Sequence, residues 1–171
     1  MILESEVIYR EEQSFGFWLR RLVVGSMALA VGLSIFSLIK MPCGEDPSKA
    51  SEILTVAVAG ILVPIVVAAL FGALKLETEV RQDGLYIRYF PFHMHFKRFA
   101  AEDLSEYYAR QYRPILEYCG WGIKCGRGGR AYNVSGNEGV QLVFKNGKRL
   151  LIGSQRAEEL EEAIRSIMES N

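Results

Sequence analysis

Two long uncharged runs dominate the hydrophobic pattern in the first half of the chain. Residues 22–39 contain no charged side chain, and neither do residues 53–74. Both runs are close to the roughly 20 residues that an α-helix needs to cross the hydrocarbon core of a bilayer. The roughly 100 residues that follow are too few to surround two uniformly apolar helices, as a soluble protein would require. The pattern therefore predicts two transmembrane helices.

The segment between the two runs, residues 40–52, is short and can only join neighbouring antiparallel helices. The flanks carry the basic side chains Arg20 and Arg21 before the first run and Lys75, Arg81 and Arg88 after the second. The connection instead contains two lysines and three acidic residues. Because cytoplasmic flanks are enriched in Lys and Arg, this distribution places both termini in the cytoplasm. We expect a two-span, multi-pass protein of the cell membrane. Neither run contains an ionisable residue, which favours an anchor over an ion or proton pathway.

After the second run the pattern changes to short alternating segments typical of β-strands. Asp83-Gly84 separates residues 76–81 from residues 85–90, and Asn146-Gly147 separates residues 140–144 from residues 149–152. Both dipeptides favour the tight turn of a β-hairpin. Further strands are predicted at residues 92–99, 103–110, 121–124 and 131–134.

The last segment has helical periodicity. Ser154 can cap a helix over residues 155–169, with Glu158 and Glu159 in its first turn, where negative charge is favourable. Leu160, Ala163, Ile164, Ile167 and Met168 form one apolar stripe at helical spacing. The predicted fold class is therefore an α+β membrane protein. A transmembrane α-hairpin precedes a small antiparallel β-sheet or open barrel, and a C-terminal amphipathic helix completes it. We divide the chain into an N-terminal cytoplasmic segment (1–21), the hairpin (22–74) and the β domain (75–171).

This order resembles the membrane-anchored bacterial pleckstrin-homology-like (PH-like) proteins, a largely uncharacterised family. The resemblance rests on the two spans, the Asp-Gly hairpin and four short stretches. These are Trp-Gly-Ile-Lys (121–124), Gly-Val-Gln-Leu-Val-Phe (139–144), Asn-Gly-Lys (146–148) and Ser-Gln-Arg-Ala-Glu-Glu-Leu (154–160). It is best over residues 119–165. These motifs are structural, so the resemblance implies an architecture and a cytoplasmic module but no activity.

Charge adds a candidate binding surface. The formal net charge is zero, which gives no reason to expect a nucleic-acid partner. Residues 76–156 nevertheless contain thirteen Lys and Arg against eight Asp and Glu. The Gly/Arg-rich stretch 126–136 lacks the Gly-Lys-Ser/Thr ending of a phosphate-binding P-loop, so nucleotide binding is not expected. Five basic residues would bind a protein partner or anionic lipid headgroups if their side chains share a face turned to the bilayer. They are Arg127, Arg130, Lys145, Lys148 and Arg149.

Two groups of residues suggest chemistry, and for both we favour the simpler interpretation. His93 and His95 would share one face of the strand predicted at 92–99 and could chelate a metal if Cys119 or Cys125 supplied a third ligand. No companion stands at a recognisable ligand spacing, so we interpret them as polar residues on a solvated face. Cys119 and Cys125 could form a redox pair, but neither lies in a CxxC motif. The three cysteines, an odd number, predict no disulfide framework and no structural zinc site.

The resulting hypothesis is a non-enzymatic membrane protein without a metal or cofactor. Its cytoplasmic domain would bind a protein partner or anionic lipid, and the bilayer itself is a partner; a homo-oligomer remains open. One alternative is a membrane-bound enzyme that uses Cys119 or the His93/His95 pair. The other is an accessory subunit of a larger membrane complex that acts through its helical hairpin.

Overall fold

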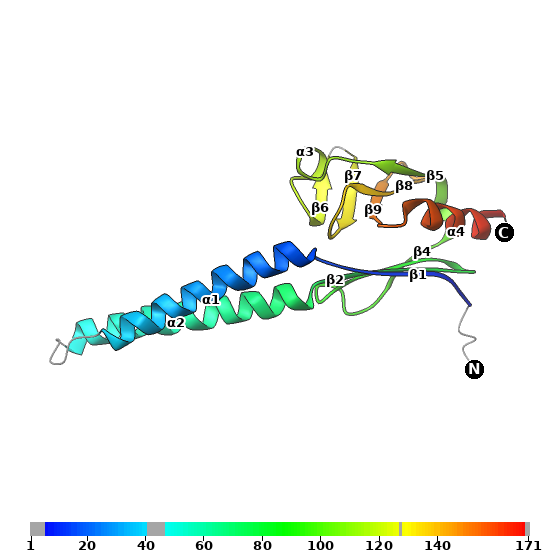
Figure 1. Ribbon diagram of the computed structural model, residues 1–171. Coiled ribbons are helices and arrows are strands. Elements are labelled where there is room, and N and C mark those ends of the chain that lie inside the picture. Colours follow the sequence, from blue (N-terminus) through cyan, green and yellow to red (C-terminus); the bar gives the residue numbers. More distant parts are fainter. Residues whose placement is uncertain (1–5, 41–46, 127, 170–171) are drawn as a thin grey trace. The chain divides into compact units, whose positions relative to one another are not determined.

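The computed structural model describes residues 6–40, 47–126 and 128–169. It separates into two compact units. A helical unit covers Gly16–Ala73, and an α+β domain combines the chain before it with the chain from Leu74 onward. Figure 1 shows the elements of both units.

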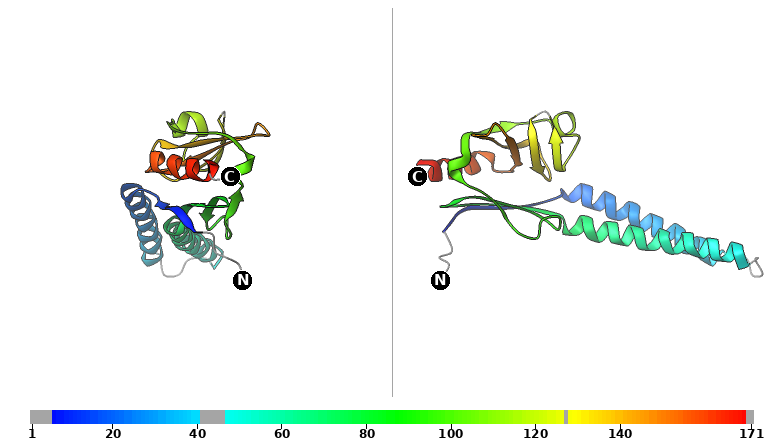
Figure 2. Two further views of the ribbon diagram at one scale, coloured as in Figure 1. Left: turned by 90° about the vertical axis from the view of Figure 1, so that its right-hand side faces the viewer. Right: turned by 180° about the vertical axis from the view of Figure 1, so that it is seen from behind.

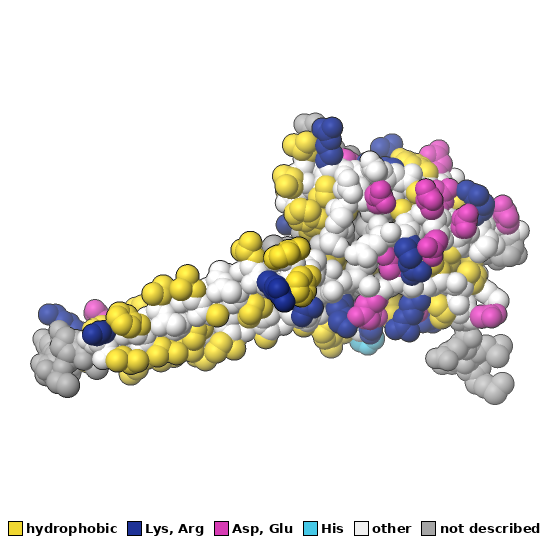
Figure 3. Space-filling model, in the orientation of Figure 1, with side chains coloured by type: hydrophobic (Ala, Val, Ile, Leu, Met, Phe, Trp, Pro, Cys, Tyr) yellow, Lys and Arg dark blue, Asp and Glu magenta, His cyan; other side chains and the backbone are white. Residues whose placement is uncertain are grey.

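The helical unit consists of α1 (Phe17–Ile39) and α2 (Pro47–Ala73), which pack against each other. Arg20–Ile39 and Ser48–Ala73 are long and apolar enough to cross a membrane, and most of their side chains are exposed. Apolar side chains cover the length of the unit in Figure 3. A Cβ atom on Gly60 of α2 would lie 2.3 Å from Ser34 Oγ of α1. The missing side chain therefore lets the two helices approach closely, as small residues do in membrane helix pairs.

The first sheet of the domain contains a strand that the sequence analysis missed. It consists of β1 (Val7–Ser14), β2 (Lys75–Arg81), β3 (Gly84–Phe90) and β4 (Lys97–Phe99), in that order and all antiparallel. The sequence predicts a separate segment over residues 1–21, whereas the structure makes β1 an edge strand of the domain. The buried positions of β1 are Tyr9, Glu11 and Gln13, so its inward face lacks the apolar alternation that identifies a strand.

This pairing determines how the helices connect to the domain. Ser14, the last residue of β1, pairs with Lys75, the first residue of β2. The chain therefore leaves one end of the sheet for α1 and returns from α2 to the same end, one strand away. The helical unit is an insertion between two neighbouring strands.

The second sheet has the order β5-β8-β9-β7-β6. β7 and β9 are parallel and the other pairs are antiparallel, so the predicted purely antiparallel arrangement is wrong for this sheet. β9 pairs with β8 on one edge, as the second strand of a hairpin, and with β7 on the other edge, where the two strands run in the same direction. The elements are η1 (Ala101–Asp103), β5 (Leu104–Gln111), α3 (Pro114–Tyr118), β6 (Gly122–Gly126), β7 (Gly129–Asn133), β8 (Glu138–Phe144) and β9 (Arg149–Gly153).

The C-terminal helix α4 (Ala157–Glu169) confirms the predicted amphipathic helix and contributes to the core of the domain. It contacts β1, β2 and β3 of the first sheet as well as β5 and β8 of the second, and Figures 1 and 2 show it beside both. Its apolar stripe is buried except at Met168, which is half-buried, and Leu160, Ile164 and Ile167 are almost fully excluded from solvent. The Ser154 hydroxyl accepts a hydrogen bond from the Arg156 N–H (3.0 Å) just before the helix.

Candidate functional site

A groove of about 950 Å³ in the domain collects cations from three parts of the chain. Lys97 and Arg98 come from β4, Arg130 comes from β7, and Lys148 and Arg149 come from the hairpin between β8 and β9. No Asp or Glu is among the described residues that line it. We call this site the basic groove. Its remaining lining includes Phe99, Cys125, Tyr132, Phe144 and Leu150.

The aromatic residues give the basic groove an apolar surface beneath its charges. The rings of Phe99 and Phe144 lie 5.7 Å apart and join β4 of the first sheet to β8 of the second. Tyr132 is buried and contacts Lys97, whose Nζ lies 3.4 Å from the Tyr132 hydroxyl oxygen. The groove therefore combines positive charge with apolar contact area.

The five cations differ in how far they are already neutralised. Arg98 Nε lies 3.2 Å from a carboxylate oxygen of Asp83, and the same guanidinium donates to the Asp83 backbone carbonyl. Within the described part of the chain, no carboxylate lies in ion-pairing range of Arg130, Lys148 or Arg149. All three are exposed. These guanidinium and ammonium groups are therefore available to an anionic ligand.

Close packing of β7 on β9 brings two of these cations to the same wall. Gly129 has φ +96°, and a Cβ atom there would lie 2.3 Å from the Arg149 carbonyl oxygen. Only glycine adopts this conformation without strain and leaves room for that carbonyl. The next residue, Arg130, pairs with Leu150 of β9, directly after Arg149.

The structure brings together part of the predicted binding set. Arg130, Lys148 and Arg149 line the basic groove. Lys145 is exposed at the start of the same β8–β9 turn but does not line the groove, and Arg127 lies outside the described residues. The sequence analysis did not include Lys97 and Arg98, which contribute two of the five cations. Their adjacency was visible in the sequence, but their approach to β7 depends on contacts between the two sheets.

The predicted strand over residues 92–99 is wrong for most of its length. Only Lys97–Phe99 forms β4, and residues 91–96 form a loop. The chain turns because the His93 N–H donates to the Tyr89 carbonyl (2.8 Å). His93 and His95 therefore do not share a strand face. Among the described residues, no group of three or more His, Cys, Asp and Glu could hold a metal ion.

His93 lies close to the cations of the basic groove. It is half-buried, and its ring packs edge-on against Tyr132 with centroids 5.7 Å apart. Burial, together with the positive charges of Lys97 and Arg130, lowers the pKa of His93. The neutral ring is therefore favoured where it lies.

The cysteines do not form a disulfide in the described chain. Cys119 and Cys125 are both free and exposed. Cys119 ends α3 in a left-handed conformation (φ 58°), and Cys125 lies on β6 at the wall of the basic groove. Cys43 lies outside the described residues.

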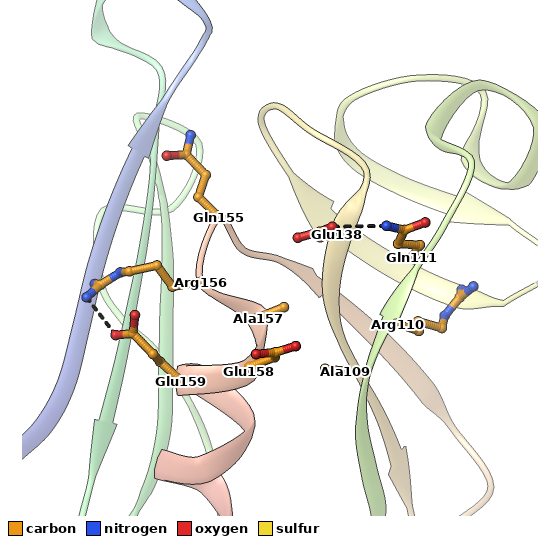
Figure 4. Close-up of a pocket in the computed structure, with 9 residues that line it drawn as sticks. All are labelled: Ala109, Arg110, Gln111, Glu138, Gln155, Arg156, Ala157, Glu158 and Glu159. Carbon is orange, nitrogen blue, oxygen red and sulfur yellow. Dashed lines mark hydrogen bonds and ion pairs between the residues drawn. The ribbon is translucent and has the colours of Figure 1, made fainter.

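A second cleft, of about 490 Å³, has the opposite electrostatic character (Figure 4). Its cations already have partners. Arg156 pairs with Glu159 (3.1 Å), and Arg110, which points away from the cleft, pairs with Glu117 (2.9 Å). The carboxylates of Glu138, Glu158 and Glu159 also line it. The basic groove is therefore the better candidate for an anion. The second cleft is lined by Ala109, Arg110, Gln111, Glu138, Gln155, Arg156, Ala157, Glu158 and Glu159.

Comparison with known proteins identifies a family but no activity. The model of a family of unknown function, DUF6141, matches residues 3–171. No curated protein matches the chain.

Proposed function

We propose that this chain, which belongs to the DUF6141 family of unknown function, is a membrane-anchored binding protein whose basic groove holds the anionic headgroup of a lipid. The observation that carries the proposal is the groove itself: five cations and no carboxylate line it. A phosphate matches the bidentate geometry of Arg130 and Arg149, and Lys148 adds a mobile point charge.

The apolar part of the groove favours a lipid over a small free anion. The half-buried rings of Phe99 and Phe144 provide contact area that inorganic phosphate would leave exposed to water. A headgroup attached to a glycerol and the first carbons of acyl chains would cover it. The proposed role needs no catalytic residue or cofactor, so we infer a binding protein rather than an enzyme.

The anchor in this proposal is the pair α1 and α2. Both are long and apolar enough to cross a bilayer, and they form an insertion between β1 and β2. Since the chain leaves and re-enters the sheet at one end, two crossings would keep β1 and the rest of the domain on one side. The basic flanks, beginning with Arg20 and Arg21, favour the cytoplasmic side for both termini. The PH-like and bacterial assignments stay predictions.

The test uses the full chain in mixed micelles that contain equal amounts of phosphatidylglycerol and phosphatidylcholine. Native mass spectrometry counts the lipid molecules retained by the protein. We expect a preference for phosphatidylglycerol. The double variant Arg130→Gln/Arg149→Gln should weaken it about 30-fold, because each cation near the headgroup contributes about 1 kcal/mol.

Lys145→Gln is the matched control, because it removes a lysine from the same hairpin turn without changing the groove lining. Its effect should stay below about threefold. Equal retention of both lipids by the unaltered chain, or an equal loss in Lys145→Gln and the double variant, would contradict the proposal. Competition by inorganic phosphate at concentrations that match the lipid would show a site for free phosphate and would also contradict it.

A further inference from the structure

We propose that the loop between β3 and β4, residues 91–96, inserts its exposed apolar side chains into the headgroup region of the membrane that α1 and α2 enter. This inference rests on the membrane anchor of the proposed function but does not depend on a ligand in the basic groove. It assigns a lipid surface as the partner of Phe92 and Met94, which line neither cleft.

The loop exposes the side chains that a soluble protein would bury. Phe92 and Met94 are 61% and 64% exposed, whereas His93 between them is half-buried against Tyr132. Over residues 92–94 the apolar and polar positions are thus inverted relative to a loop that faces water, whereas His95 is exposed and Phe96 is half-buried. Such local inversions are expected at functional sites, where contact with another surface compensates for the exposure.

The loop that carries the exposed Phe92 and Met94 is held at both ends by contacts with β3. At one end, the His93 N–H bonds to the Tyr89 carbonyl. At the other, Phe96 packs under the guanidinium of Arg88, which lies 4.6 Å from its ring centroid. Phe96 also contacts the ring of Tyr86 at 6.4 Å. With these two anchors, Phe92 and Met94 have a defined outward direction.

Strand register places the loop at the end of the sheet that connects to the helices. Lys75, the first residue of β2 after the helical insertion, pairs with Ser14 on one side and with Phe90 on the other. Phe90 is the last residue of β3, so the loop begins where the chain leaves for α1 and returns from α2. The loop therefore starts at the same end of the sheet as the two connections to the helices, which is the end from which both helices would enter a membrane.

Charge around the loop also fits a lipid surface. The loop contains no Asp or Glu, and it is followed directly by Lys97, which forms no ion pair with a described carboxylate. Exposed aromatic and aliphatic side chains beside cations are the composition of segments that lie at a membrane interface.

The experiment measures the depth of single nitroxide labels in the full chain, reconstituted in vesicles of phosphatidylcholine and phosphatidylglycerol. The native thiols are removed by Cys43→Ser, Cys119→Ser and Cys125→Ser. One sample carries the label at Met94→Cys and the control carries it at Gln82→Cys. Gln82 is exposed in the β2–β3 turn, at the opposite end of the same sheet. Collision rates with oxygen, which concentrates in lipid, and with a water-soluble nickel chelate are compared by electron paramagnetic resonance.

We expect the oxygen-to-nickel collision ratio to be at least tenfold higher at Met94 than at Gln82, and a label at Phe92→Cys should behave like that at Met94. Equal ratios at Met94 and Gln82 would overturn the inference. Shielding of the Met94 label from both reagents would also overturn it, because that result indicates a protein contact.

Two further measurements separate this result from the proposed function. Resistance of the same protein to extraction by alkaline carbonate reports the membrane anchor, and retention of phosphatidylglycerol reports the basic groove. A lipid-exposed Met94 label without phosphatidylglycerol retention would support the loop and contradict the groove. A water-exposed Met94 label in a carbonate-resistant protein that retains phosphatidylglycerol would contradict the inference about the loop and support the basic groove.

Discussion

Glu11 connects the strand before the helices to the start of the last helix, and its replacement by glutamine should destabilise the domain. The side chain is buried, with 6% of the residue exposed. Its carboxylate accepts hydrogen bonds from the Tyr9 hydroxyl (2.7 Å), the Ser154 hydroxyl (2.7 Å) and the Gln155 N–H (2.9 Å). Two of these donors are more than 140 positions away in the sequence.

The expected loss of stability follows from the number of hydrogen bonds that an amide side chain can accept. Glu11→Gln keeps the shape but replaces one acceptor oxygen with an NH2 group, which then faces a donor. A hydrogen bond to a charged group contributes about 1.5–3 kcal/mol, and the loss is of that order. Glu12→Gln is the matched control, because the neighbouring Glu12 forms an exposed ion pair with Lys75. Such surface pairs contribute about 0–1 kcal/mol.

Thermal unfolding of the full chain in detergent measures the difference. Trp18→Phe leaves Trp121, which donates to the Gly136 carbonyl in the domain, as the fluorescent reporter. A domain of this size loses about 4–8 °C in Tm for each kcal/mol. Glu11→Gln should therefore lower Tm by about 6–24 °C, and Glu12→Gln by less than about 8 °C. A Tm for Glu11→Gln equal to or above that of Glu12→Gln would refute the role assigned to Glu11.

Two further predictions concern the basic groove. Because burial and the charges of Lys97 and Arg130 lower the pKa of His93, it should titrate below the ordinary value of about 6.5 in histidine NMR spectra. The unfolded chain then binds more protons than the folded one, so His93 makes the domain less stable as pH falls through that range. A lipid phosphate in the basic groove would offset the repulsion between protonated His93 and the cations Lys97 and Arg130, and would therefore raise the pKa of His93. Because protonated His93 then favours the bound phosphate, the lipid should bind more tightly as pH falls. His93→Gln should abolish this dependence; an unchanged pH profile in His93→Gln would show that another group is responsible. Gly129→Ala should lower Tm and the phosphatidylglycerol preference together, because its methyl group would meet the Arg149 carbonyl. Gly147→Ala, also at positive φ but with no atom within 4 Å, should cost only about 1–2 kcal/mol and retain the preference.

The parts of the fold that depend on local patterns could be predicted from the sequence. Asp83-Gly84 and Asn146-Gly147 each encode a tight turn within a few residues, and the structure has the β2–β3 and β8–β9 hairpins at these points. The apolar stripe of α4 and the two uncharged helices are likewise local signals. The family resemblance supplied the expectation of a PH-like module, which stays a prediction.

Features that depend on distant contacts could not be predicted. β1 turns polar side chains inward, and two of the three hydrogen bonds to Glu11 come from Ser154 and Gln155, far away in the sequence. The parallel pairing of β7 with β9 has no local signature, and it determines where Arg130 and Arg149 meet. For the same reason, the sequence indicated three of the five groove cations and missed Lys97 and Arg98, which approach from the other sheet.

The insertion of the helices between β1 and β2 also fixes the order in which the protein can assemble. During synthesis, β1 emerges first but has no partner until residues 75–81 leave the ribosome, after both helices. The first sheet can therefore close only after both helical segments have been synthesised. A fragment that starts at Leu76 would lack β1 and expose β2 as an unprotected edge, where strands of other copies can add.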